Sequence, residues 1–202
     1  MHTMSIDQYL HEVTTAVAAL DRSQIARVAD VLMDAWHTGA TVYTLGNGGS
    51  AALASHMACD LAKNTSPDLG RGPGQKSGQR LRVMSLADNA ALMSALGNDI
   101  DYADIFVEQL KSVLGPSDVI IAISGSGTSP NVLRALEYGR TVGATTIGFT
   151  GSRETSAPML ELSDVALRVP VAMMEQIEDL HVVVNHVLAV HLRSRIAEAV
   201  HG

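Results

Sequence analysis

Short apolar runs alternate with helical patterns along most of this sequence. Four runs are rich in β-branched and aliphatic residues, at 41–45, 81–86, 118–123 and 145–150, and a weaker fifth lies at 165–169. Helical patterns lie between most of them, at 50–62, 102–113 and 130–142. Parallel strands need a crossover connection, and a helix usually provides it. The alternation therefore predicts an α/β fold built from βαβ units, with a parallel sheet and right-handed crossovers.

Long helices are predicted at both ends of the chain. In residues 5–37, apolar residues recur at three- and four-residue steps, which predicts one long or slightly broken helix that ends at Gly39. The last helical pattern extends over 174–200. Residues 40–170 between them form the α/β core, and we find neither an internal repeat nor a second core. Because 202 residues suit one domain, a single domain over 1–202 is expected.

Composition and charge exclude several classes of partner. Aromatic residues make up only 3% of the chain and the net charge is −7, whereas single strands of nucleic acid are bound by stacking rings and duplexes by a basic surface. The first ten residues lack the basic and apolar regions of a signal peptide, and no apolar run approaches the length of a membrane span. Cys59 is the only cysteine, so an intrachain disulfide is impossible. We predict a soluble, cytoplasmic protein that binds no nucleic acid and no membrane.

Two loops rich in glycine and serine each follow a predicted strand and precede a predicted helix. They are GNGGS at residues 46–50 and SGSGTS at residues 124–129. Glycine lets the backbone come close to a ligand, and the unpaired amides at the start of a helix favour an anion. Ser50 and Ser129 are predicted to cap the two helices, with Pro130 at the first helical position. A single such loop would be interpreted as an ordinary tight turn, but two in the same context favour a ligand site.

The chemistry of these loops selects a class of ligand. Hydroxyl and amide groups bind phosphate without a basic residue, which is compatible with an acidic chain. Neither loop contains the Gly-Lys-Ser/Thr pattern of ATP sites or the GxGxxG pattern of dinucleotide sites. The loops therefore predict a sugar phosphate as the ligand, ahead of ATP or NAD.

The segment 64–80 is the most irregular part of the sequence. It contains four glycines, two prolines and several basic residues. The simpler interpretation is a surface loop. The alternative is a lid whose Arg71, Lys76 or Arg80 helps to hold a phosphate.

Histidines and carboxylates gather on two of the predicted helices. His56 and Asp60 are four residues apart and share one face of the helix that follows the first loop. In the last helix, the segment QIEDLHVVVNH carries four more such residues, Glu178, Asp179, His181 and His186. Spacing alone does not choose among these four, although histidine and carboxylate ligands suit zinc or another divalent metal. The residues alone leave a metal site, an acid–base site and a cluster of packed side chains as alternatives.

Five motifs, in order, resemble the sugar isomerase (SIS) domain family. They are GNGGS, SHMACDLA, GNDIDYADIF, ISGSGTSPNV and QIEDLHVVVNHVL, and together they extend over nearly the whole chain. Within the family the sequence is most similar to phosphoheptose isomerases. The resemblance implies a three-layer α-β-α sandwich with a five-stranded parallel sheet and long N- and C-terminal helices. It also implies a homotetramer whose active sites are shared between subunits.

The resemblance assigns roles to individual residues. Zinc would be bound by His56, Asp60, Glu178 and His186. Asp60 occupies the position of the family's catalytic glutamate, and His186 that of its second acid–base residue. The sugar phosphate would contact Asp60 and Glu178, and further Asn47, Gly48, Gly49, Ser50, Asn98, Asp99, Ser124, Gly125, Ser126 and Ser129.

Two substitutions depart from the family pattern. Asp60 replaces the usual glutamate and is one methylene shorter, while Glu178 replaces a glutamine. A shift of a catalytic base by about 1 Å can cost on the order of 10²-fold in rate. Both carboxylates are therefore candidates for the base.

The resemblance implies an aldose–ketose isomerisation through an enediol, from sedoheptulose 7-phosphate to D-glycero-D-manno-heptose 7-phosphate. A carboxylate would remove the proton beside the carbonyl and His186 would transfer a proton at the oxygen, while a metal polarises the carbonyl. Two alternatives belong beside this hypothesis. One is a sugar-phosphate sensor without catalysis, and the other is an isomerase of a pentose or hexose phosphate.

Overall fold

A five-stranded sheet forms the centre of the fold. The computed structural model describes residues 4–67 and 78–201, and the strand order in the sheet is β2-β1-β3-β4-β5. Every neighbouring pair of strands is parallel. The strands are β1 (Thr41–Gly46), β2 (Arg82–Ser85), β3 (Val119–Ile123), β4 (Thr145–Thr150) and β5 (Val165–Arg168). Each lies within one residue of its predicted run, so the five-stranded parallel sheet is confirmed.

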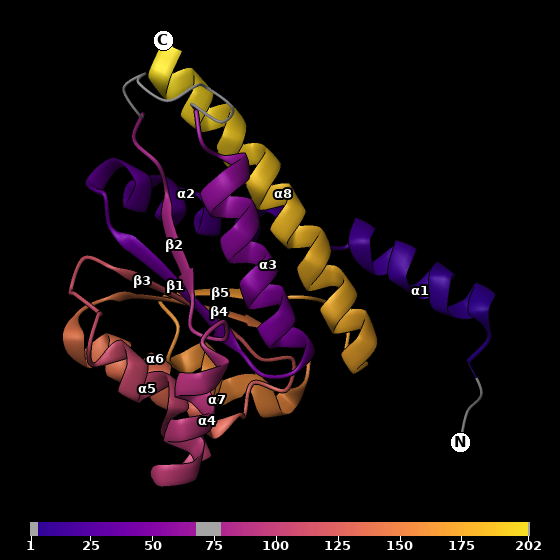
Figure 1. Ribbon diagram of the computed structural model, residues 1–202. Coiled ribbons are helices and arrows are strands. Elements are labelled where there is room, and N and C mark those ends of the chain that lie inside the picture. Colours follow the sequence, from indigo (N-terminus) through magenta and orange to yellow (C-terminus); the bar gives the residue numbers. More distant parts are fainter. Residues whose placement is uncertain (1–3, 68–77, 202) are drawn as a thin grey trace.

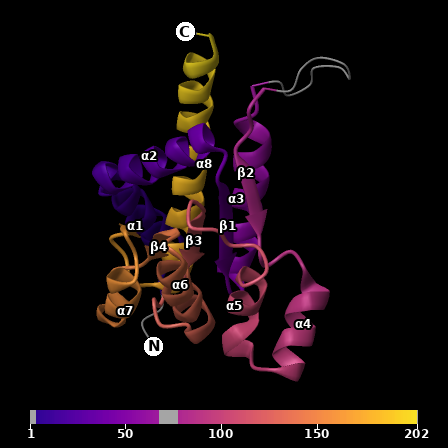
Figure 2. The same cartoon turned by 90° about the vertical axis from the view of Figure 1, so that its left-hand side faces the viewer.

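Helices cover both faces of the sheet and give three layers (Figure 1 and Figure 2). One face packs against α2 (Arg22–Thr38), α3 (Gly49–Asn64) and α8 (Met174–His201). The opposite face packs against α5 (Ile105–Leu110), α6 (Pro130–Val142) and α7 (Ala157–Glu161). Successive residues of a strand point to opposite faces, so Ile121 enters the first core and Ile120 the second. The predicted α-β-α sandwich is therefore confirmed.

The N-terminal helical pattern folds as two helices. Residues 19–21 separate α1 (Ile6–Ala18) from α2, and the Asp21 side chain accepts a hydrogen bond from the Ser23 amide at 2.8 Å, which starts the second helix. The end of α2 is at Gly39, as predicted, with φ at 73°. Figure 1 shows α1 beside the beginning of α8 and away from the sheet. There the Tyr9 hydroxyl donates to Asp179 Oδ2 at 2.6 Å.

Two short helices lie outside the sequence prediction, α4 (Ala90–Asp99) and α7. The N-cap of α4 is Asn89, whose side chain accepts from the Leu92 amide at 3.0 Å, but the helix has no fully buried residue, and only its Met93 and Leu96 pack against the core. The helix predicted at 102–113 is shorter. A 3-10 turn, Tyr102–Asp104, leads into α5, and a second one, Glu154–Ser156, precedes α7.

The C-terminal helix α8 lies along α3 (Figure 1). Its 28 residues begin and end within one residue of the predicted range 174–200. Val184, Leu188 and Leu192 are buried in the core, whereas His186 is exposed. Within the described ranges, no helix is both long and apolar enough to span a membrane. The packing of α8 against α3 brings together the two helices on which histidines and carboxylates gather.

Candidate active site

The order of the strands determines where a ligand can bind. The chain passes from β1 outward to β2 on one side, and from β3 outward to β4 on the other. In open parallel sheets, the crevice at such a reversal, beyond the carboxyl ends of the strands, binds the ligand. The two predicted loops follow β1 and β3, the adjacent strands at this reversal. They enclose a cavity of about 270 Å³ lined by Asn47, Gly48, Gly49, Ser50, Ile123, Ser124, Gly125, Ser126, Ser129, Met174 and Glu178.

The first loop turns into α3 through a glycine. Gly48 has φ at 55°, a left-handed conformation that a side chain disfavours. It is the N-cap of α3 and offers no side-chain hydrogen bond, while Ser50 already lies inside the helix. The prediction that Ser50 caps the helix is therefore wrong, because the helix begins one residue earlier, at Gly49. The first amides of the helix have no carbonyl partner within it and are available to an anion.

The second loop gathers hydroxyl groups around one atom. Ser124 Oγ lies 3.3 Å from both Ser126 Oγ and Ser129 Oγ, and it accepts a hydrogen bond from the Gly127 amide at 3.1 Å. Ser129 is at the N-cap position of α6, with Pro130 next, as predicted, but its side chain makes no capping hydrogen bond. These hydroxyl groups line the cavity and form a donor set suited to phosphate oxygens.

Asn47 is fixed by two residues that the sequence reasoning missed. Asn47 and Asn131 exchange amide hydrogen bonds of 2.9 Å and 2.8 Å, and the Tyr102 hydroxyl donates to Asn47 Oδ1 at 3.2 Å. Asn131 is buried at the start of α6. Asn131 directly follows Ser129 and Pro130 in the sequence, which could have indicated a role near the second loop. Only the fold shows that its side chain faces the first loop.

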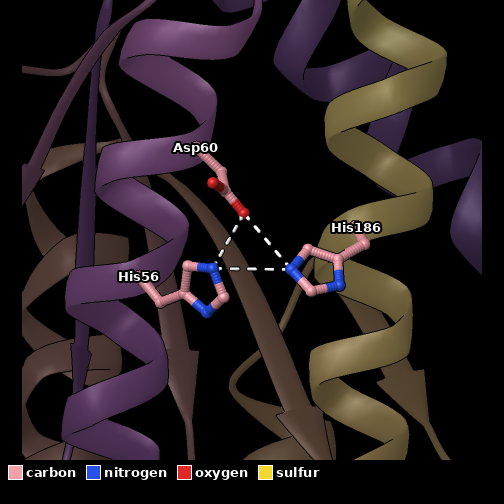
Figure 3. Close-up of side chains that lie close together, drawn as sticks. All are labelled: His56, Asp60 and His186. Atoms are coloured by element: carbon pink, nitrogen blue, oxygen red, sulfur yellow. Dashed lines mark hydrogen bonds and ion pairs between the residues drawn. The ribbon is translucent and has the colours of Figure 1, made fainter.

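Three predicted residues from α3 and α8 converge on one point (Figure 3). Asp60 Oδ2 lies 3.2 Å from His56 Nε2 and 3.6 Å from His186 Nε2, and the two imidazole nitrogens are 3.4 Å apart. Their potential ligand atoms all lie within 4.8 Å of one another. Two histidines and one carboxylate form a donor set that suits zinc.

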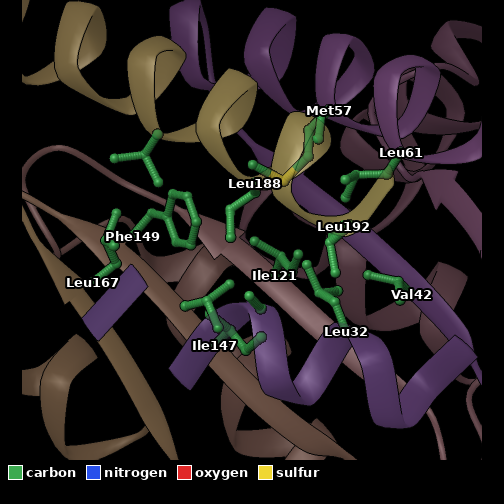
Figure 4. Close-up of a cluster of buried hydrophobic side chains, with 14 of the residues drawn as sticks. Leu32, Val42, Met57, Leu61, Ile121, Ile147, Phe149, Leu167, Leu188 and Leu192 are labelled. Carbon is green, nitrogen blue, oxygen red and sulfur yellow. The ribbon is translucent and has the colours of Figure 1, made fainter. Parts of the chain in front are cut away.

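Core packing holds this triad in place. The residues that follow His56 and Asp60 in α3 are Met57 and Leu61, and both are completely buried. They pack in one apolar cluster with Leu188 and Leu192 of α8 (Figure 4). The polar residues on the adjoining face of each helix are thereby brought opposite one another.

Asp60 is held by two asparagines that the sequence reasoning also missed. Asn185 Nδ2 donates to Asp60 Oδ2 at 2.9 Å, and Asn64 Nδ2 donates to Oδ1 at 3.1 Å. Asp60 is only 9% exposed, and Asn185 is completely buried. Asn64 is one helical turn after Asp60 and Asn185 directly precedes His186, but the pairing of α3 with α8 is needed to recognise either.

Glu178 lies apart from the triad, at the first turn of α3. A Cβ atom on Gly49 would come within 2.5 Å of Glu178 Oε1, so the carboxylate rests directly on the glycine. Glu178 lines the cavity between the two loops and also an adjoining cavity of about 290 Å³ that reaches His56. The structure thus brings together three of the four residues predicted to bind metal and places the fourth, Glu178, beside the predicted sugar-phosphate site.

His181 lines the adjoining cavity with its ring buried. Its Nε2 lies 3.4 Å from the Thr150 carbonyl oxygen. Burial lowers the pKa of His181 to about 4, because the charged imidazolium would lose its hydration. The residue is therefore neutral at physiological pH.

Other predicted residues lie elsewhere. Asn98 and Asp99 are exposed at the end of α4, where Asn98 Nδ2 donates to Asp99 Oδ1 at 2.8 Å, and neither lines the two cavities described above. Arg80 is exposed before β2. Arg71 and Lys76 lie outside the described residues.

Comparisons with known proteins agree with this geometry. The SIS domain matches residues 8–151, more than half of the chain. A phosphoheptose isomerase of Rhodospirillum rubrum is 37% identical over 164 residues, which cover 81% of either chain. One of Aquifex aeolicus is 33% identical over 187 residues, which cover 93% of this chain and 92% of the relative.

The solved structure of a phosphoheptose isomerase from Neisseria gonorrhoeae has the same fold. It matches with a TM-score of 0.81 and 23% identity, and the match covers 94% of this chain and 97% of that one. The domain match and the curated relatives extend over both loops and the α3 histidine. The chain therefore belongs to the SIS domain family, and within that family it is an isomerase of the phosphoheptose isomerase type.

Proposed function

We propose that this protein converts sedoheptulose 7-phosphate into D-glycero-D-manno-heptose 7-phosphate by aldose–ketose isomerisation. The observation that carries the proposal is the continuity of the site. The hydroxyl-lined loop 124–129 is at one end, His56 is at the other, and Gly49, Ser50 and Glu178 line the cavities at both ends. A long sugar phosphate can therefore be held by its phosphate while its carbonyl end lies near the histidines.

The phosphate end of this site supplies binding energy and orientation. Ser124, Ser126 and Ser129 present hydroxyl groups, and the first amides of α3 present N–H donors with the positive end of the helix dipole. Holding the far end of the substrate fixes the reacting carbons in position, which converts remote binding energy into rate.

The triad fits a zinc ion by the chemistry of its donors. His56, Asp60 and His186 would hold the metal, with Glu178 as a candidate fourth ligand. When bound, the ion would polarise the sugar carbonyl. His186, more than half exposed at its side chain, is placed to transfer a proton at a sugar oxygen, and one of the carboxylates Asp60 and Glu178 takes the carbon-bound proton.

We also propose that the protein acts as a homotetramer with shared active sites. Asn98 and Asp99 lie outside the two cavities, which is expected if they contact the substrate of a neighbouring subunit. On α1, Ile6 is 81% and Leu10 59% exposed, as residues of an interface would be in an isolated chain. We further propose that the protein is located in the cytoplasm. Cys59 is the only cysteine, so the chain forms no intrachain disulfide, which is typical of proteins from a reducing compartment.

An assay of the purified protein tests the function directly. The protein is treated with a chelator, supplied with sedoheptulose 7-phosphate with or without zinc, and followed by NMR for the aldose phosphate. We expect zinc-dependent conversion, which His186→Gln abolishes and the distant Asp34→Asn on α2 leaves unchanged. Saturable binding without conversion would instead identify a sensor, and conversion of only a pentose or hexose phosphate would identify a different isomerase.

A further inference from the structure

The two carboxylates of the site have different surroundings, and this difference distinguishes their roles. We propose that Glu178 is the base that takes the proton from the sugar carbon, while Asp60 is a positioning residue that holds the two histidines. The inference rests on the proposed isomerase function and specifies which of its two acids performs the proton transfer.

Both carboxylate oxygens of Asp60 already face other protein groups. Its Oδ2 is approached by His56, His186 and Asn185 at 3.2, 3.6 and 2.9 Å, and its Oδ1 accepts from Asn64 at 3.1 Å. It is only 9% exposed and lines neither of the two cavities at the site. A base must reach the proton that it removes within hydrogen-bond distance. Asp60 would have to give up one of these contacts to do so, whereas Glu178 would not.

The orientation of the Asn185 side chain favours its hydrogen bond to Asp60 over a hydrogen bond to its own oxygen. Its amide nitrogen faces Asp60 Oδ2, while its own Oδ1 is buried with no hydrogen-bond partner among the described residues. An unpaired buried oxygen is unfavourable. The amide keeps this orientation because its N–H group satisfies the carboxylate, which fixes Asp60 as an acceptor facing the two histidines.

Glu178 has the opposite surroundings. It lines both cavities, so its carboxylate lies between the hydroxyl-rich loop and His56. No side chain lies beneath it, since Gly49 has none, and the start of α3 stabilises a negative charge there. A carboxylate that is anchored on a rigid helix and open to the substrate cavity has the features of a general base.

The step balances without a further reactant. Glu178 takes a proton from C1 of the ketose, the C1–C2 bond becomes the double bond of an enediol, and the carbonyl oxygen at C2 gains a proton from His186. The protonated Glu178 then returns its proton to C2, and the hydroxyl at C1 gives its own proton back to His186 as the aldehyde forms. The triad of His56, Asp60 and His186 would still offer zinc three protein ligands, the number found in catalytic zinc sites.

Three variants of the full-length protein test the assignment, Glu178→Gln, Asp60→Asn and the exposed control Glu137→Gln on α6. Exchange of the C1 protons of sedoheptulose 7-phosphate with D₂O reports proton transfer, and competition with a chromogenic chelator reports zinc affinity. We expect Glu178→Gln to lower exchange and kcat by about 10²- to 10⁴-fold with zinc affinity within about threefold of wild type. Asp60→Asn should lower zinc affinity by more than about tenfold, and Glu178→Asp should retain part of the exchange.

Each possible result either supports or contradicts the assignment of Glu178 as the base. Wild-type protein that neither exchanges nor converts the sugar overturns the proposed function and this inference with it. An active wild type with a Glu178→Gln variant that keeps more than a tenth of the exchange overturns the inference alone. Equal losses of zinc affinity in Glu178→Gln and Asp60→Asn would make Glu178 a ligand, which also overturns it. Thermal melts of all variants identify any loss that comes from unfolding.

Discussion

Asn185 on α8 donates its amide hydrogen to Asp60 on α3 at 2.9 Å, so the acid of one helix is oriented by the helix that faces it. Replacing Asn185 by leucine removes this donor from a buried carboxylate. Outer residues that orient a metal ligand typically contribute 10- to 100-fold in affinity. We expect Asn185→Leu to lower zinc affinity by about that factor and to destabilise the fold by about 1–3 kcal/mol.

Chelator competition and urea unfolding measure the two effects of Asn185→Leu. Asn64→Ala is the matched comparison, because Asn64 binds Oδ1 of Asp60, the oxygen that neither histidine approaches. It should weaken zinc binding less than Asn185→Leu does. Equal effects of the two variants would show that Asn185 has no special part in orienting the triad.

Gly49 tests whether the position of Glu178 matters for turnover. A methyl group at Gly49 would come within 2.5 Å of Glu178 Oε1 and push the carboxylate away from the start of α3. We expect Gly49→Ala to lower kcat on the order of 10²-fold, as a displacement of about 1 Å can. Gly143→Ala at the end of α6 is the control. Gly143 has φ at 89°, so alanine there lowers the melting temperature and leaves kcat unchanged.

Ser124 tests the phosphate end of the site. Its hydroxyl is the point on which those of Ser126 and Ser129 converge, and it also accepts from the Gly127 amide. We expect Ser124→Ala to raise KM for the sugar phosphate about tenfold and to weaken competitive inhibition by inorganic phosphate equally. Steady-state kinetics check both, with Thr141→Ala on α6 as the control. Unchanged inhibition by phosphate would place the phosphate elsewhere.

The layers of the fold could be predicted from the sequence because its central strands are buried on both faces. A fully buried strand appears as a short apolar run, and β1 and β3 are buried along their whole length. The helix α4 escaped prediction for the opposite reason. None of its residues is fully buried, and only Met93 and Leu96 pack against a core, which is too few for a recognisable periodic pattern.

The candidate site could be predicted only in part. His56 and Asp60 share a helix face by their spacing, and the two loops are recognisable from their glycines and serines. The supporting residues Asn131 and Asn185 act across the fold, from α6 to the first loop and from α8 to α3. Nothing in the spacing of the chain encodes a contact between residues so far apart. The same holds for Glu178, whose separation from the triad follows from the way in which α8 lies along α3.

The exposed face of α1 tests the proposed assembly. Ile6 and Leu10 are apolar, lie one helical turn apart, and are 81% and 59% exposed. A charge at Leu10 would remain hydrated in a monomer but would be buried without a partner in an interface. We expect Leu10→Glu to shift the mass measured by light scattering from that of a tetramer toward smaller species. The variant should also lose activity, because Asn98 and Asp99 would no longer reach a neighbouring site. The exposed control Glu137→Gln on α6 should change neither. A wild-type protein that is monomeric and fully active would contradict the proposal.

His181 gives the stability of the fold a pH dependence with a definite sign. Burial lowers its pKa to about 4 in the folded protein, while the unfolded chain keeps a value near 6.5. Between these two values the unfolded state binds more protons than the folded state, so the free energy of unfolding falls as the pH falls through this window. The full loss in the free energy of unfolding across this window amounts to about 3 kcal/mol.

Urea unfolding from pH 7 to pH 4 tests this dependence. The free energy of unfolding should decline less steeply in His181→Gln than in wild type, while the surface variant His37→Gln keeps the wild-type slope. Parallel declines in all three proteins would mean that the protonation of carboxylates, and not that of His181, limits the stability at low pH.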